Sequence, residues 1–477
     1  MPAPPSLTYA TISSSLPSKP YILSITPSPT NPHLILSHPG PDLTICDNQT
    51  LQPVERLQGG HQGNVTSVSV DQDSLWSSAK DGFIVRWDER SRRPGTLIRA
   101  TVRKPIPVTA LTVSSRDHLV IGGTELVSAE SHIIFWDDRN NKQPLYLHSS
   151  THSDDITHLS ILPLTQTFLP SSSSSSTNGP LPEHLLLSSS TDGLIALSNL
   201  KESDEDEAVL TTENWNQSIA DSGYYLHKSK NQKMKLWSRS DMDQIQIWDI
   251  GQNHEGEIEL QNQVEYPSSS FKFKSFKPPK QGPSITQTAT EEFESKVQLQ
   301  SDYLIDVLPS LGISKYGGPI TASGTNEGDI IIQHHSGLDS YSPSSYFLSG
   351  PSKSRGHKDV IRSIYHDVTN EALYTGSEDG ILSGWNLNSL SDKLLVGDDE
   401  IDLSGDEDQD MSDSDEESEI VTEESDDKSD ESDDDDLMGI SKQEGEGPRY
   451  GPIIGGSSNK AEDRRKEKRK EKRFGPY

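Results

Sequence analysis

One pattern recurs along this chain and restricts what it can fold into: a histidine, two short apolar runs, an Asp-Gly pair, a third apolar run and a tryptophan. Residues 61–90 read HQGNVTSVSVDQDSLWSSAKDGFIVRWDER, and residues 357–387 read HKDVIRSIYHDVTNEALYTGSEDGILSGWNL. In both, the tryptophan follows the aspartate by six residues. Residues 152–200 repeat the order with an insertion, and Ser198 and Asn199 stand in place of the final tryptophan and aspartate. Self-similarity of this kind predicts an array of one β-rich unit.

Four further units complete the array. They lie at residues 21–47, 106–139, 224–250 and 302–335. The ends of successive units are 49, 63 and 49 residues apart, counted through Trp87, Trp136, Asn199 and Trp248. Short β-rich runs separated by turns predict four strands in each unit. Seven such units predict an all-β fold, a seven-bladed β-propeller that closes on itself and leaves no long free edge.

The boundaries of the propeller follow from composition. Only 30% of the residues are hydrophobic, so the folded part is predicted to be diluted by polar segments. We expect the propeller to occupy residues 1–396, interrupted by a Ser/Pro loop at 163–183 and by a mostly disordered insert at about 251–300. An acidic segment, 397–437, and a basic C-terminal tail, 438–477, are predicted to be disordered because their apolar content cannot form a core.

The N-terminal segment SLTYATISSS, residues 6–15, alternates weakly between polar and apolar residues before the first unit begins. We expect it to supply the outer strand of the last blade. That strand would join the two ends of the ring and would be a mechanical clasp rather than a binding site.

The net charge of −32 is distributed unevenly. Residues 398–436 hold 23 acidic residues and one lysine, whereas residues 460–473 hold nine basic and four acidic residues. The remainder of the chain is only mildly acidic. Duplex nucleic acid is therefore an unfavoured partner for the folded body.

Histidine, serine and aspartate recur together within the units. Asp81 lies in a tight turn before Gly82, so its carboxylate can accept from the ring of His61. That ring in turn meets the hydroxyl of Ser77, and the indole of Trp87 donates at the end of the network. The last unit holds the same tetrad, namely His357, Thr375, Asp379 and Trp385. A partial set without tryptophan occurs at His152, Ser188 and Asp192.

These tetrads are predicted to hold the fold together rather than to perform chemistry. A catalytic triad needs one such set with an exposed nucleophile and an oxyanion hole. Here the set recurs, and a threonine replaces the serine in the last unit. A recurrent network instead satisfies buried polar groups and ties strands together. We therefore predict no catalytic residue and no enzymatic activity.

No cofactor or metal is favoured by the sequence. The single cysteine, Cys46, can form neither a disulfide within the chain nor a cysteine-based zinc cluster. The fifteen histidines show no spacing typical of a ligand set. The pair His334-His335 is predicted to end a strand rather than to bind a metal.

The arrangement of these units resembles the WD-repeat family. Beyond the generic repeat, seven short stretches resemble one subfamily in order and spacing: GGTEL (122–126), IIFWDDR (133–139), HSDDIT (152–157), SSTDGL (189–194), DEDEAVLTT (204–212), DYLI (302–305) and SGTNEGDI (323–330). The resemblance implies a seven-bladed scaffold without enzymatic activity. The serine loop, the insert and the charged tail depart from the subfamily pattern.

Two units end in Trp-Asp-x-Arg, at Arg90 and Arg139. This ending resembles the motif of substrate receptors that dock on the damaged-DNA-binding adaptor of cullin-RING ubiquitin ligases. An arginine at the blade rim could make a bidentate contact with an adaptor carboxylate. The alternative interpretation is that both arginines are ordinary solvated turn residues.

Three charged segments carry further hypotheses. FKFKSFKPPK, residues 271–280, could grip single-stranded RNA or act as a nuclear import signal, or it is a plain linker. The acidic segment could bind basic ribosomal or chromatin proteins, or it only keeps the chain soluble. Its serines 412, 414, 425, 429 and 432 precede acidic residues, as acidophilic kinases favour.

The basic tail resembles a nuclear or nucleolar address, and the alternative is a short solvated helix. The candidate address residues are Arg464, Arg465, Lys466, Lys468, Arg469, Lys470, Lys472 and Arg473. The N-terminus does not read as a signal peptide, and no apolar run approaches the ~18 residues of a membrane helix. We therefore expect a soluble, intracellular protein of the nucleus, although the cytoplasm is also compatible.

Taken from the sequence, the function is that of a non-enzymatic, monomeric nuclear scaffold that binds proteins through a propeller face and the charged tail. The first alternative is a substrate receptor of a cullin-RING ligase. The second is a ribosome-assembly or RNA-associated factor. No partner is specified, because propellers of one fold host unrelated functions.

Overall fold

A computed structural model describes residues 6–29, 32–163, 184–226, 234–253, 257–268, 274–276, 298–311, 317–336, 341–349 and 355–387. Most of the Ser/Pro loop, much of the 251–300 insert, the acidic segment and the basic tail lie outside these residues, as do the candidate address and the tail serines.

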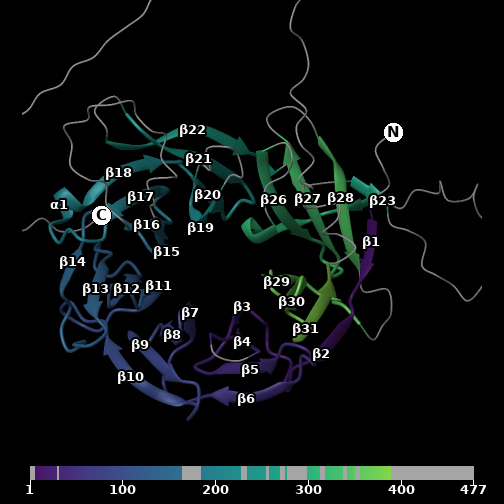
Figure 1. Cartoon of the computed structure of the whole chain (residues 1–477), viewed down its shortest axis with the longest axis horizontal. Helices are drawn as coiled ribbons and strands as arrows, with labels where there is room; N and C mark the ends of the chain where they lie inside the picture. Colours follow the sequence, from purple (N-terminus) through teal and green to yellow (C-terminus); the bar gives the residue numbers. More distant parts are fainter. Residues whose placement is uncertain are drawn as a thin grey trace, which may run out of the picture. The chain divides into compact units, whose positions relative to one another are not determined.

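Seven sheets, the blades, are arranged in a ring, and the pairing within them is antiparallel apart from one N-terminal strand (Figure 1). Blade 1 contains β3 (Ser24–Pro27), β4 (His33–Ser37), β5 (Leu43–Asp47) and β6 (Pro53–Leu57). Blade 2 contains β7 (Val65–Asp71), β8 (Ser74–Ala79), β9 (Phe83–Asp88) and β10 (Arg93–Arg99). Blade 3 contains β11 (Val108–Ser114), β12 (Leu119–Thr124), β13 (Ile133–Asp137) and β14 (Tyr146–His148).

The next two blades repeat the order. Blade 4 contains β15 (Ile156–Pro163), β16 (His184–Ser190), β17 (Leu194–Asn199) and β18 (Val209–Asn214), with the short helix α1 (Glu205–Ala208) before its last strand. Blade 5 contains β19 (Ile219–Leu226), β20 (Met234–Ser240), β21 (Ile245–Gln252) and β22 (Ile258–Tyr266). A separate two-stranded sheet pairs β23 (Lys274–Phe276) with β24 (Gln298–Gln300).

The last two blades each take a strand from the N-terminus. Blade 6 contains β25 (Tyr303–Val307), β26 (Gly317–Gly324), β27 (Ile330–Ser336), β28 (Tyr341–Ser349) and β1 (Ser6–Tyr9), with the 3-10 helix η3 (Pro309–Leu311) after β25. Blade 7 contains β29 (Ile361–Asp367), β30 (Ala372–Ser377), β31 (Ile381–Asn386) and β2 (Ile12–Ser15). The predicted seven-bladed all-β propeller is confirmed.

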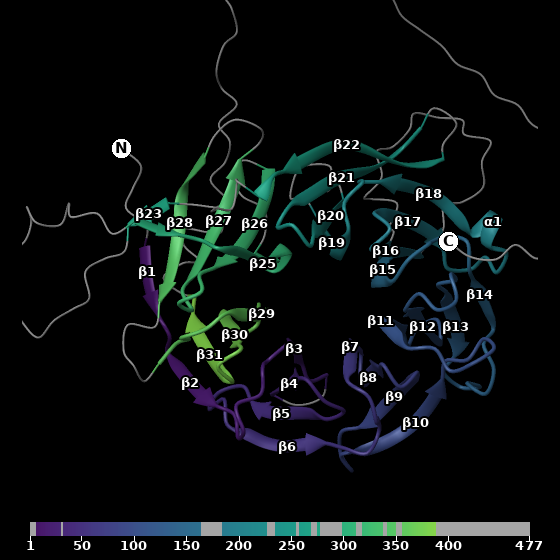
Figure 2. The same cartoon turned by 180° about the vertical axis from the view of Figure 1, so that it is seen from behind.

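Ring closure follows the prediction for β2 and differs for β1. Strand β2 pairs antiparallel with β31, as an outer strand of the last blade should. Strand β1 instead pairs parallel with β28 and extends blade 6, and both views show the two strands side by side (Figure 2). Between them, Ala10 is 4% exposed, and Leu16 beyond β2 is 3% exposed. The N-terminus therefore bridges blades 6 and 7.

Part of the range predicted as a mostly disordered insert, about 251–300, is a strand of the propeller. Residues 258–266 form β22, which pairs along β21 and completes blade 5. Its apolar residues are sparse, and Ile258, Leu260 and Tyr266 are buried while most of the residues between them are polar and partly or fully exposed. An outer strand packs only one face, so it needs few apolar residues. Low apolar content led to the wrong prediction for these residues.

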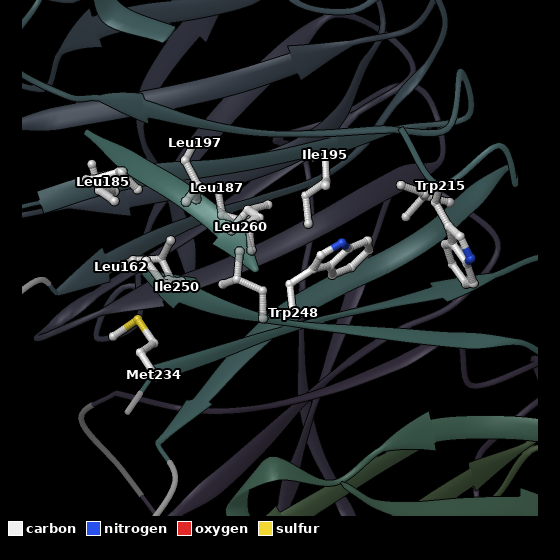
Figure 3. Packing of buried hydrophobic residues seen from close by; sticks show 13 residues of the cluster. Leu162, Leu185, Leu187, Ile195, Leu197, Trp215, Met234, Trp248, Ile250 and Leu260 are labelled. Atoms are coloured by element: carbon white, nitrogen blue, oxygen red, sulfur yellow. The ribbon is translucent and has the colours of Figure 1, made fainter. Parts of the chain in front are cut away.

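Strand burial follows position within a blade. All six residues of β8 are buried, because a central strand packs a neighbouring blade on each face. In the outer strand β10, exposed residues alternate with partly or fully buried ones. The core therefore lies between blades. Between blades 4 and 5, Leu187 and Ile195 pack near Trp248, Ile250 and Met234 (Figure 3).

Candidate functional site

The blade 2 tetrad converges on one hydroxyl group. The Oγ atom of Ser77 lies 2.7 Å from Nε2 of His61 and 2.8 Å from Nε1 of Trp87, which donates to it. Ser77 is fully buried, and the other two side chains are almost as inaccessible. Burial lowers the pKa of His61, against the raising effect of Asp81, so the ring is neutral at pH 7. The hydroxyl can then donate to His61 while accepting from Trp87.

Asp81 plays a different part from the one the sequence predicts. Its Oδ1 atom lies 3.6 Å from Nδ1 of His61, longer than a hydrogen bond. Its carboxylate instead accepts from three backbone amides, those of Gln62 at 2.6 Å, Gly63 at 3.3 Å and Phe83 at 2.9 Å. The aspartate thus fastens the loop before the blade to the turn inside it.

Blade 7 repeats this geometry. Thr375 Oγ1 lies 2.6 Å from Nε2 of His357 and accepts from Nε1 of Trp385 at 2.8 Å. The Asp379 carboxylate is 3.8 Å from Nδ1 of His357 and accepts the amides of Lys358 and Ile381, both at 2.9 Å. Burial opposes ionisation of Asp379, but contact with His357 and the two amides holds its pKa below the ordinary value.

Blade 4 holds the partial set. His152 Nε2 lies 2.8 Å from Ser188 Oγ, and its Nδ1 is 3.5 Å from Asp192. Ser198 occupies the tryptophan position and is buried, and its hydroxyl has no hydrogen-bond partner among the described residues. Blades 1 and 6 hold further histidine–hydroxyl pairs that the repeat pattern does not reveal. They are His38–Thr44 at 3.0 Å and His335–Thr321 at 2.8 Å.

These networks leave no room for nucleophilic attack at the hydroxyls concerned. Ser77, Ser188 and Thr375 are each fully buried, so none can meet a substrate. In blades 2 and 7 the hydroxyl also accepts from a tryptophan. What the arrangement can do is satisfy buried polar groups and fix the loops that enter each blade.

The two Trp-Asp-x-Arg endings occupy equivalent turns, after β9 and after β13. In each, the aspartate accepts the backbone amide of the arginine, at 3.0 Å in Asp88–Arg90 and 2.9 Å in Asp137–Arg139. Arg139 also grips Asp137 with Nε at 2.9 Å and Nη2 at 2.8 Å, which holds the pKa of Asp137 well below its usual range. Within the described part of the chain, the exposed guanidinium of Arg90 forms no ion pair.

The structure brings together a charged cluster that sequence reasoning missed. In β15, β19 and β25 the strand register shifts once, and the first residue paired after the shift is His158, Asp221 and Asp306, respectively. These are therefore equivalent positions in blades 4, 5 and 6. Nδ1 of His158 lies 2.7 Å from Asp221 across the blade boundary, and Arg239 pairs with Asp221 in register.

The two carboxyl groups of this cluster respond oppositely to their surroundings. Burial opposes ionisation of Asp221, but the charge and hydrogen bond of His158 hold its pKa below the ordinary value. Burial and then the charge of Asp221 raise the pKa of Asp306 to about 7, against the weaker effect of Arg239. Asp306 therefore keeps its proton up to about pH 7, whereas Asp221 ionises more readily than an ordinary aspartate.

This cluster predicts a pH dependence. Because the pKa of Asp306 is raised on folding, the folded state keeps a proton that the unfolded chain releases between about pH 4 and pH 7. The contribution of Asp306 to stability is therefore lost as the pH rises through that window. Between pH 4 and pH 7, the free energy of unfolding of Asp306→Asn should rise by roughly 1–2 kcal/mol relative to that of the native chain. This figure is discounted from the full pKa shift because water reaches the cluster.

The measurement is chemical denaturation of both chains across that pH range, with the exposed Asp73→Asn as the matched control. The difference between Asp306→Asn and the native chain should grow with pH, whereas the control difference should stay flat. Parallel pH profiles for all three chains would contradict the raised pKa of Asp306.

The described residues contain no group of three or more side chains placed to hold a metal ion. None of the helices among them has the length and apolar content needed to span a bilayer.

Comparisons with known proteins place the repeats in context. No family model matches the chain. An uncharacterized WD repeat-containing protein of Schizosaccharomyces pombe is 21% identical over 359 residues, which cover 74% of this chain and 92% of that protein. The crystal structure of the computationally designed Ika8 protein covers 80% of this chain and 100% of its own, at 16% identity and a TM-score of 0.46. The subfamily suggested by seven short stretches is WD repeat-containing protein 89, and that narrower likeness stays a prediction.

Proposed function

We propose that this seven-bladed β-propeller, whose repeats resemble WD repeats, is a non-enzymatic scaffold that binds protein partners in the nucleus. WD-repeat propellers are generally protein-interaction scaffolds. One observation carries the proposal: the hydroxyls that most resemble nucleophiles, Ser77, Ser188 and Thr375, are fully buried in structural networks. Among the described residues, the chemistry left at the surface is that of rims and turns, which suits binding.

The partner class follows from charge. The segment 398–436 has a net charge of −22, which attracts basic proteins such as ribosomal or chromatin proteins. Phosphorylation of its serines would deepen that charge. We propose a monomer, because closure by β1 and β2 leaves the ring complete within one chain.

Nuclear localisation is testable through the basic tail. A fluorescent fusion ending at residue 459 lacks all eight candidate address residues and should shift towards the cytoplasm. A full-length fusion in which the same eight residues are changed to glutamine is the matched control, since it keeps chain length. If both variants stay nuclear, the basic tail is a solvated helix rather than the address, or the address moves to Lys272–Lys280. A native fusion that stays in the cytoplasm would overturn the nuclear proposal itself.

A ubiquitin-ligase receptor is the second candidate, and the equivalence of the Arg90 and Arg139 turns favours it. The two arginines occupy the same rim position in adjacent blades, as a two-point adaptor contact requires. The two hydrogen bonds that Arg139 donates to Asp137 count against the receptor function, because docking would have to break that ion pair.

We expect Arg90→Ala with Arg139→Ala to melt like the native chain, because both side chains are exposed and surface pairs contribute little. Proximity labelling followed by mass spectrometry should recover most partners with both chains. Arg103→Ala with Lys104→Ala, two exposed cations of the β10–β11 loop at the opposite end of the blade, is the control. If an adaptor and a cullin accompany the native chain and vanish only from the Arg90 and Arg139 variant, the receptor function replaces the scaffold function, since a lost desolvated arginine contact costs about tenfold or more in affinity.

A further inference from the structure

A groove of about 840 Å³ lies between blades 1 and 2. It opens on the face that carries the β7–β8 and β9–β10 turns, opposite the loops that the tetrads fasten. Ile45 and Trp87 contribute its buried apolar surface, and Val54 adds an exposed apolar wall, with 44% of the residue accessible. Gly95 and Thr96 form the edge contributed by β10.

Three arginines line this groove, namely Arg86, Arg90 and Arg92. Arg92 is engaged, since its Nη1 lies 2.5 Å from Glu55 of blade 1. Arg86 lies over the ring of Trp76 at 5.8 Å from the centroid, which orients its guanidinium and leaves its N–H groups unpaired with carboxylates. Among the described residues, neither Arg86 nor Arg90 forms an ion pair.

The acidic residues of the groove are largely engaged by the protein itself. Asp88 accepts from the amides of Arg90 and Ser91 and from the Ser91 hydroxyl. Glu89 accepts from Ser28 Oγ at 2.5 Å, which ties blade 2 to blade 1. Asp73 is an exposed carboxylate at the groove. Two arginines thus face the groove with unused donors, whereas two of its three acids are already satisfied.

We propose that this groove binds an acidic segment of a partner protein that carries aliphatic or aromatic side chains between its acids. Planar guanidinium groups bind carboxylates in a bidentate manner, and Arg86 and Arg90 supply two such groups. Apolar side chains of the segment would cover Val54 and the floor formed by Ile45. The proposal rests on the scaffold function and names the site and the chemistry of one partner.

A peptide suits the groove better than a nucleic acid does. A nucleic acid backbone places a charge at every step and needs a run of unpaired cations. Here two unpaired arginines stand beside Asp73 and an apolar wall. Alternating acidic and apolar side chains match that pattern, because successive residues of an extended peptide point to opposite sides.

The test is fluorescence anisotropy on the full-length chain. The probe is a fluorescein-labelled synthetic peptide in which glutamates alternate with leucines, and the comparison probes are the same peptide with serine for leucine and a single-stranded oligonucleotide. The native chain should bind the leucine peptide most tightly. Arg86→Ala with Arg90→Ala should weaken that binding roughly tenfold or more. Arg139→Ala and Arg103→Ala should bind as the native chain does.

Four outcomes would overturn the proposal that the groove binds such a segment. The native chain would fail to bind the leucine peptide, or the Arg86 and Arg90 variant would bind it as tightly as the native chain. The native chain would bind the serine peptide equally well, or it would bind the oligonucleotide more tightly than the leucine peptide. Its failure is distinguishable from failure of the scaffold function. If labelled partners are recovered and persist with the Arg86 and Arg90 variant, the scaffold stands without this groove; if none is recovered with any chain, the scaffold itself fails.

Discussion

Deleting residues 1–20 is expected to open the ring and to cause the largest loss of stability of any change considered. The deletion removes β1 and β2, so β31 and β28 each lose a paired neighbour. It also removes the buried Ala10 and Leu16. Lost side-chain burial and lost ladder hydrogen bonds together amount to about 3–6 kcal/mol. The exposed edges of blades 6 and 7 should also promote edge-to-edge association.

Thermal melting and size-exclusion chromatography check this expectation. Deletion of residues 1–5 is the matched control, since both strands remain. Deletion of residues 1–10 separates the two contributions, because it removes β1 and keeps β2. If the chain lacking residues 1–20 melts at the native temperature and elutes as the native chain does, the N-terminus does not close the ring.

Thr375→Val should destabilise blade 7 by roughly 2–4 kcal/mol. Valine has nearly the shape of threonine, so no cavity forms, but His357 and Trp385 both lose their buried partner. An unsatisfied buried donor or acceptor costs its full desolvation penalty. Asp379→Asn should cost about 1–3 kcal/mol, because the amide replaces one carboxylate oxygen that accepts from a backbone amide.

Urea denaturation of the two variants measures these costs, and Thr375→Ser is the control because it keeps the hydroxyl. A near-native midpoint for the serine variant with a lowered midpoint for the valine variant assigns the cost to the hydroxyl. Equal midpoints for the valine variant and the native chain would show that the tetrad does not stabilise the blade.

The sequence by itself determined the fold and the chemistry within a blade. His61, Ser77 and Trp87 lie within thirty residues, so one blade and the loop that enters it bring them together. The hydroxyl-centred contacts in blades 2 and 7 follow from that local order. The role of Asp81 was harder to predict from the sequence, because backbone amides of the preceding loop compete with His61 for its carboxylate.

Only the tertiary structure decided how blades meet. Strand β1 joins blade 6 because the N-terminus passes β28, more than 300 residues away in the sequence. His158, Asp221 and Asp306 occupy equivalent positions because the first strand pair of their blades shifts register at the same place, as it also does in blades 2, 3 and 7. Whether Arg90 forms an ion pair likewise depends on which nearby carboxylates already accept hydrogen bonds from the neighbouring turns. Local pattern sets strand order and side-chain direction, whereas charge coupling and grooves arise between sheets whose contacts no short stretch of sequence encodes.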